Sequence, residues 1–233
     1  MKFLIRLSVL GLLLISGLLM LTSVDTEFDA ADELIFTDVF KLTKNHRGAD
    51  YLEELDNLRK VQQLVMSIAP VGDPIPDYLS REPADLVRHR SGLCYDRSRT
   101  FDKVYKWMGF ETRHIYILYK GRFVNYFPQA LAPLMAFFSY GQPSHAVTEV
   151  KTSRGWVLVD SNSEWIAVDK LGNPVPADDI WKSKLKFSTV PAYMLEPYWA
   201  IRGMYSRRGH LYRPYIPFPE FNVPDLVAWA YGD

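Results

Sequence analysis

Apolar residues recur every three or four positions between residues 50 and 68, and Pro70 follows them. This spacing places the apolar side chains on one face of a helix and predicts an amphipathic helix over 50–68. Pro83 opens a second, shorter helical segment, because proline is favoured at the first position of a helix. The same spacing from Phe101 to Met108 predicts a third helix, which ends before Gly109.

Alternating β-branched and aromatic residues predict a strand over Thr112–Tyr119. Ser144–Lys151 and Gly155–Asp160 alternate in the same way and lie close together in the sequence, which predicts a β-hairpin. Glu164–Asp169 is a candidate for a further strand. Residues 171–233 show no periodic core of their own, so we expect a C-terminal extension that packs on the rest of the protein.

Residues 123–141 are unusually apolar, although Pro128 and Pro133 interrupt them. The run is too short to span a bilayer. A helix-containing insertion packed on the domain is the ordinary expectation, since apolar stripes mostly become buried. A lid over a cleft, or a patch that touches a membrane, is the alternative.

The first 24 residues have the pattern of a targeting segment. Lys2 and Arg6 precede an apolar run over residues 7–21, and acidic residues follow it. This pattern predicts a signal peptide or a membrane anchor that contacts the membrane through residues 4–24. The body would then lie on the extracytoplasmic side, or be secreted if the segment is cleaved. Residues 25–48 are interpreted as a linker.

Composition narrows the function classes. The 27 Lys and Arg residues balance the 27 Asp and Glu residues, so no basic surplus points to nucleic acid. The five histidines are scattered without the spacing of a metal site, and we expect neither a metal nor another cofactor. The single cysteine, Cys94, excludes an intrachain disulfide. In an exported chain, this raises the chance that Cys94 is present for its chemistry.

Cys94 follows Gly92 and begins the third predicted helix. The partial positive charge of a helix N-terminus favours thiolate over thiol. Burial as a small apolar residue is the alternative. If Lys151 pairs with Arg154 in the hairpin, His145 falls opposite Asp160 with Cβ atoms about 5 Å apart, close enough for a carboxylate to orient an imidazole. A bulge in the hairpin would change this register.

Three motifs occur in a fixed order: Gly92-Leu93-Cys94-Tyr95-Asp96, His145-Ala146-Val147-Thr148-Glu149, and Gly155-Trp156 through Asp160-Ser161. Together they resemble the transglutaminase-like superfamily, whose core is papain-like. The resemblance implies an α+β domain over 49–170, with the nucleophile helix packed on an antiparallel sheet. It also implies a triad of Cys94, His145 and Asp160. Val147, where the family usually has Trp, and Ser98, where it usually has a small apolar residue, depart from the pattern.

The resemblance implies thiol-dependent acyl transfer through a thioester, by amide hydrolysis or transamidation. A peptide, a protein or a small amide could be the substrate. The alternative is a non-catalytic binding module of the cell envelope that keeps the same fold. Asp96, close to the thiol, is interpreted as a helix cap or as an ion-pair partner of Arg97 or Arg99 rather than as a base.

Overall fold

The structure is a computed structural model of the chain, and it describes residues 11, 16–17, 22–120, 128, 131–138, 143–182, 187–206 and 218–232. Nearly all of the predicted targeting segment lies outside these ranges. So do residues 123–127, 129–130 and 139–141 of the apolar insertion. Within the described ranges, no helix combines the length and the hydrophobicity needed to cross a bilayer.

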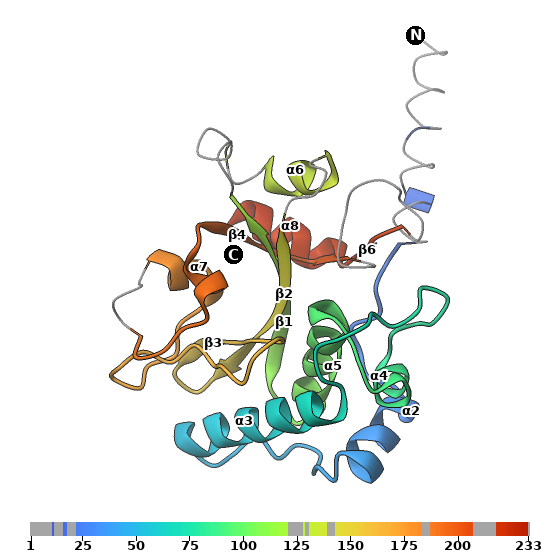
Figure 1. Cartoon of the computed structure of the whole chain (residues 1–233), viewed down its shortest axis with the longest axis vertical. Coiled ribbons are helices and arrows are strands. Elements are labelled where there is room, and N and C mark those ends of the chain that lie inside the picture. Colours follow the sequence, from blue (N-terminus) through green and yellow to red (C-terminus); the bar gives the residue numbers. More distant parts are fainter. Residues whose placement is uncertain are drawn as a thin grey trace.

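A four-stranded antiparallel sheet forms the centre of the molecule, with the strand order β3-β2-β1-β4 (Figure 1). Its strands are β1 (Glu111–Tyr119), β2 (Ser144–Thr152), β3 (Gly155–Val159) and β4 (Tyr198–Arg202). The first three are the strands that alternation predicts. The fourth comes from the C-terminal extension, which therefore completes the sheet by pairing with β1. A second, two-stranded sheet joins β5 (Met204–Tyr205) to β6 (Glu220–Phe221).

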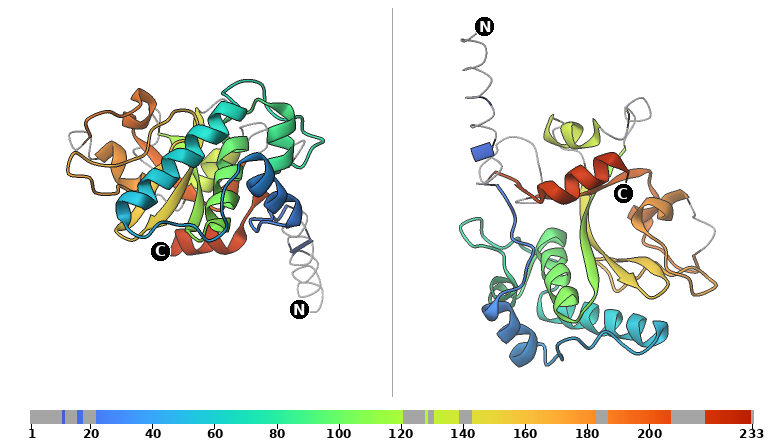
Figure 2. Two further views of the ribbon diagram at one scale, coloured as in Figure 1. Left: turned by 90° about the horizontal axis from the view of Figure 1, so that it is seen from below. Right: turned by 180° about the vertical axis from the view of Figure 1, so that it is seen from behind.

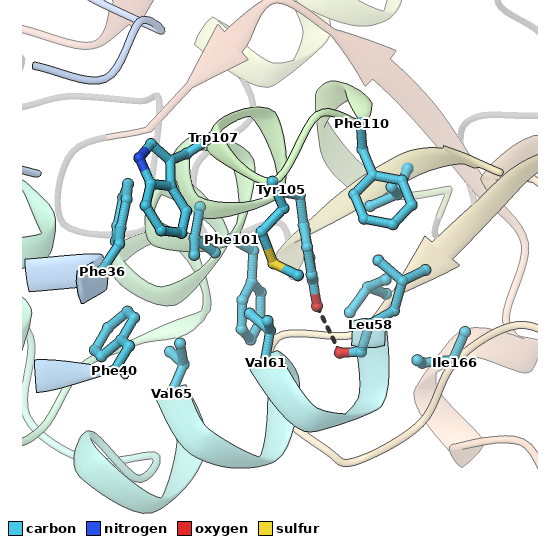
Figure 3. Packing of buried hydrophobic residues seen from close by; sticks show 14 of the residues in the cluster. Phe36, Phe40, Leu58, Val61, Val65, Phe101, Tyr105, Trp107, Phe110 and Ile166 are labelled. Atoms are coloured by element: carbon cyan, nitrogen blue, oxygen red, sulfur yellow. Dashed lines mark hydrogen bonds between the residues drawn. The ribbon is translucent and has the colours of Figure 1, made fainter. Parts of the chain in front are cut away.

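Helices α3 (Tyr51–Ile68) and α5 (Cys94–Trp107) pack against one face of the sheet (Figures 1 and 2). The Asp50 carboxylate caps α3 by accepting from the backbone N–H groups of Leu52 and Glu53. Between the two helices, the Tyr105 hydroxyl donates to the Leu58 carbonyl over 2.8 Å (Figure 3). This contact satisfies the one polar atom that the Tyr105 side chain brings into the core.

The segment predicted as a linker is instead part of the core. Residues 30–39 form the short helix α2 (Ala30–Leu34) and a π-helical turn, η1 (Ile35–Val39). Phe36 and Phe40 point into the same apolar cluster as Trp107 (Figure 3). The acidic and then mixed composition suggested a linker, but the two aromatic rings are buried because each removes a large apolar surface from water.

The remaining elements cover the rest of the sheet. Helices α6 (Ala132–Phe138) and α8 (Val223–Tyr231) lie at the end of the sheet away from α3 and pack on Trp199 and Ile201 of β4 (Figure 1). The face of the sheet opposite α3 and α5 is covered by α7 (Ala177–Ile180) and the 3₁₀ turn η5 (Ala192–Leu195). Helix α4 (Pro83–His89) precedes α5 and begins at the predicted proline.

The sequence predictions therefore hold for the three helices, for β1 and for the hairpin. The strand predicted over Glu164–Asp169 is wrong. This segment makes only isolated bridges, Val159 with Ile166 and Val168 with Pro174. A turn at 169–172, in which the Asp169 carboxylate accepts from the backbone N–H groups of Leu171 and Asn173, reverses the chain before a ladder can extend.

Candidate active site

Cys94 is the first residue of α5, and the residue is half-buried. Because an α-helix leaves its first four N–H groups without intrahelical partners, the Cys94 N–H has none within α5. Gly92 packs closely against the residues around the start of the helix. A Cβ atom at this position would lie 2.9 Å from Leu86 and 3.1 Å from Asp96. The Gly-x-Cys motif thus reflects close packing immediately before the nucleophile.

Asp96 caps the start of α5, which is one of its two predicted roles. Its carboxylate accepts from the backbone N–H of Leu93 at 2.9 Å and from that of Ile75 at 3.4 Å. Burial raises the pKa of Asp96, and these backbone donors oppose the rise. Among the described residues, Arg99 pairs with Glu82 and Glu220 instead of Asp96.

His145 is the second residue of β2, and its ring is buried. Its Nε2 lies 2.6 Å from Oδ1 of Asp160, which directly follows β3. Since Nε2 faces the carboxylate, Nδ1 is the nitrogen left for the thiol. The Cys94 thiol and the His145 side chain each shift the pKa of the other, so the same imidazole interacts with both the sulfur and the carboxylate.

The hairpin register differs from the predicted one. Thr152 pairs with Gly155 and Thr148 pairs with Val159, so the pairing is displaced by two residues. Gly155 takes the last pair of the ladder at φ +130°, a backbone conformation that glycine adopts readily. Because strand side chains alternate with a period of two, a two-residue displacement leaves His145 and Asp160 on one face. They meet as diagonal neighbours rather than as a directly opposed pair.

The short length of β3 opens the place that Cys94 occupies. Strand β3 pairs only with the second half of β2, from Thr148 onward. Among the described residues, no strand therefore pairs with the outer edge of the first half of β2. The Ala146 backbone at this edge helps to lower the pKa of the Cys94 thiol, and the Ser161 hydroxyl donates to the Ala146 carbonyl. The nucleophile thus reaches His145 at the point where the sheet ladder stops.

The protonation states follow from these contacts. Burial opposes ionisation of the thiol, but the hydrogen bond and the charge of His145 outweigh it and lower the pKa of Cys94. Burial also opposes the charged imidazole, yet the hydrogen bonds to Asp160 and Cys94 raise the pKa of His145 to about 9. These opposite shifts favour a thiolate–imidazolium pair over a thiol beside a neutral imidazole.

Asp160 is buried and held by two hydroxyl groups in addition to His145. Ser163 and Tyr193 both donate to its Oδ2 atom, which leaves Oδ1 for the imidazole. Burial would raise the pKa of Asp160, but the hydrogen bond and charge of His145 and the two hydroxyl donors hold it below its ordinary value. The carboxylate is therefore ionised at neutral pH.

Arg97 lies one helical turn after the thiol, and its side chain is fully buried. Its guanidinium donates to the Gly92 carbonyl at 2.6 Å, to the Asn162 side-chain oxygen at 2.6 Å and to the Ser161 carbonyl. These contacts join the turn before Cys94 to the turn after Asp160. The positive charge also lowers the pKa of Cys94, as a minor contribution beside that of His145.

A family model described as the transglutaminase-like superfamily matches residues 44–161, which is 118 of the 233 residues. The chain belongs to the transglutaminase-like superfamily. No curated protein matches the chain. The resemblance seen in the three motifs and the α+β fold with its antiparallel sheet are thereby confirmed. The matched range ends immediately after Asp160, so β4, η5 and α8 lie outside it.

The two departures from the family pattern have structural explanations. The Ser98 hydroxyl contacts His114 Nδ1 at 2.9 Å and Thr148 Oγ1 at 3.0 Å, so a polar residue in the helix finds polar partners on the sheet. Val147 packs in the apolar cluster on the His145 face.

The structure brings together the three residues that the sequence singled out, and it adds three others. Arg97, Ser163 and Tyr193 contact the turns or the carboxylate of the site. No sequence pattern pointed to Tyr193, because 33 positions separate it from Asp160. In the part of the chain that the structure describes, no group of three or more His, Cys, Asp or Glu side chains is arranged to hold a metal ion.

Proposed function

We propose that this protein is an exported, thiol-dependent acyl-transfer enzyme that uses Cys94, His145 and Asp160 and works through a thioester. One observation carries the proposal. A single buried imidazole hydrogen-bonds a buried carboxylate, and it lies close enough to the half-buried residue Cys94 for each of the two groups to shift the pKa of the other. This is the arrangement in which a nucleophile, a base and an orienting acid act together.

In the resting site, the thiolate of Cys94 faces the imidazolium of His145. The thiolate attacks the carbonyl carbon of an amide, a carbon–sulfur bond forms, and the carbonyl electrons move to oxygen. The backbone N–H of Cys94 is a candidate donor to that oxygen because helix geometry leaves it without a partner within α5. Asp160 stabilises the positive imidazole and fixes its orientation throughout this step.

The tetrahedral intermediate then collapses. The carbon–nitrogen bond breaks, and the amine leaves with the proton that His145 Nδ1 supplies. The acyl group remains on Cys94 as a thioester, and His145 becomes neutral. Neutral His145 next takes a proton from water or from a second amine, which attacks the thioester. Cys94 is released with a carboxylic acid as the product of hydrolysis, or with a new amide as the product of transamidation.

Export is part of the proposal and rests on the sequence. The basic residues, apolar run and acidic residues of the first 33 positions have the order of a targeting segment. The single cysteine of the chain fits a chemical rather than a disulfide role in an oxidising compartment. The substrate would then be a peptide, a protein or a small amide of the cell envelope.

Alkylation by iodoacetamide tests the proposal without a known substrate. Because Cys94 is the only cysteine, every alkylation event reports on this site. The rate should exceed that of a free thiol at neutral and mildly acidic pH, and it should fall in His145→Ala and in Asp160→Ala. Cys94→Ser serves as the blank, and circular dichroism checks that each variant is folded. A rate equal to that of a free thiol and indifferent to His145 would refute the proposal.

A further inference from the structure

Tyr193 belongs to η5, in the C-terminal extension and outside the matched family range. Its hydroxyl donates to Oδ2 of Asp160 and lies 3.4 Å from the Ser163 hydroxyl. Its ring stands nearly perpendicular to the His145 ring, with an interplanar angle of 75° and centroids 5.3 Å apart. One side chain thus touches both the base and the acid of the proposed triad.

The extension fixes Tyr193 at this place by separate contacts. Met194, the next residue, is fully buried in the apolar cluster that includes Ile117 and Val147 of the sheet. Earlier in the segment, the Thr189 carbonyl accepts from the Trp165 indole at 2.9 Å. These contacts fasten the backbone on both sides of Tyr193, so its hydroxyl is directed at Asp160 without a cost in ordering a free loop.

The contact with Asp160 suits a positioning role. A carboxylate has two oxygens and can rotate, and only one orientation presents Oδ1 to the imidazole. The donors from Tyr193 and Ser163 hold Oδ2 and thereby fix that orientation. Burial and the adjacent Asp160 charge raise the pKa of Tyr193, so its hydroxyl keeps its proton and stays a donor across the physiological range.

We propose that Tyr193 is a positioning residue for the triad and that the C-terminal extension therefore completes the active site. Tyr193 acts through Asp160: it fixes the carboxylate, the carboxylate stabilises the imidazolium, and the imidazolium stabilises the thiolate. The inference rests on the proposed function, because it assigns Tyr193 a part in the same ion pair. It assigns a functional contact to a segment outside the family match.

The test compares Tyr193→Phe with Tyr198→Phe in the full chain. Both variants lose one hydroxyl from the same face of the sheet, but the Tyr198 hydroxyl donates to the Ala177 carbonyl and does not touch the triad. The rate of Cys94 alkylation by iodoacetamide is measured against pH. The pH at which this rate reaches half of its plateau value is called the acid midpoint. Tyr193→Phe should raise the acid midpoint by about half a pH unit, which corresponds to a roughly threefold weaker ion pair. Tyr198→Phe should leave it in place. Ser163→Ala, which removes the other donor to Oδ2, should also move it upward.

The outcomes separate this inference from the proposed function. If wild-type Cys94 reacts no faster than a free thiol, the proposed function and the inference both fail. If the wild-type rate is raised but Tyr193→Phe has the same midpoint as Tyr198→Phe, or a lower one, only the inference fails. Failure of Tyr193→Phe to show a cooperative thermal transition would assign the hydroxyl to fold stability and would also overturn the inference.

Discussion

Replacing Arg97 tests whether one buried cation both holds the site together and favours the thiolate. Arg97→Met removes the charge and all the donors while keeping much of the apolar stem. Arg97→Lys keeps the charge but lacks the planar fork that reaches the Gly92 and Asn162 oxygens together. The pair of variants therefore separates the geometric effect from the electrostatic one.

The expected loss of stability can be worked out from the contacts. Hydrogen bonds to a charged group contribute about 1.5–3 kcal/mol each, so the three short contacts of Arg97 give roughly 4.5–9 kcal/mol. Burying the guanidinium costs several kcal/mol, which offsets much of that gain. Burial lowers the pKa of Arg97, in keeping with such a cost. Arg97→Met should therefore reduce the free energy of unfolding by about 2–4 kcal/mol.

For a domain of this size, such a loss lowers the melting temperature by roughly 4–16 °C, measurable by scanning calorimetry or circular dichroism. Arg97→Lys should be destabilised less. The acid midpoint of Cys94 alkylation should rise in the Met variant and stay near the wild-type value in the Lys variant. Arg88→Met is the matched control, because Arg88 is an exposed arginine with one surface ion pair. Wild-type stability in Arg97→Met, or equal midpoints in both Arg97 variants, would refute the reasoning.

Three further predictions concern the acid, a buried histidine and a glycine. Asp160→Asn should raise the acid midpoint of alkylation, because a neutral amide cannot stabilise the imidazolium; an unchanged midpoint would exclude the carboxylate from the ion pair. Burial lowers the pKa of His114 to about 3, from 6.5 in the unfolded chain. Below about pH 6.5, only the unfolded state gains this proton, so the free energy of unfolding should fall by about 2 kcal/mol by pH 5, and His114→Asn should flatten this dependence in urea titrations. Gly203 has φ +73°, and an added Cβ would lie 2.4 Å from the Asn222 carbonyl oxygen. Gly203→Ala should therefore lower the free energy of unfolding, measured by urea titration, by more than about 2 kcal/mol; an unchanged urea midpoint would contradict the close backbone approach at this turn.

The sequence predicts the elements that carry the nucleophile and the base because each has a strong local period. The helix that starts at Cys94 and the strands of the hairpin follow from such periods alone. The predicted pairing of the hairpin is displaced by two residues, yet the contact of His145 with Asp160 survives the error. Side chains of a strand alternate between the two faces of the sheet, so the face on which a residue lies is easier to predict than its pairing partner.

The parts that the sequence did not reveal depend on contacts between distant segments. Arg97 lies among polar neighbours and resembles a surface residue, because the carbonyl groups that make its burial possible come from other turns. Phe36 lies in a short helical turn and Phe40 directly follows it, so neither belongs to a long periodic pattern. Strand β4 and Tyr193 come from a segment rich in Pro and aromatic residues, where only the folded chain shows which side chains face the site.

The most direct test of the account is a titration of the thiolate itself. Ultraviolet absorbance of the thiolate is followed against pH as the difference between the wild-type chain and Cys94→Ser, with and without His145→Ala. The account predicts a thiolate that forms well below the range of a free thiol, about pH 8.5, and that loses this advantage when the imidazole is removed. A thiol that ionises near that value whether or not His145 is present would contradict it.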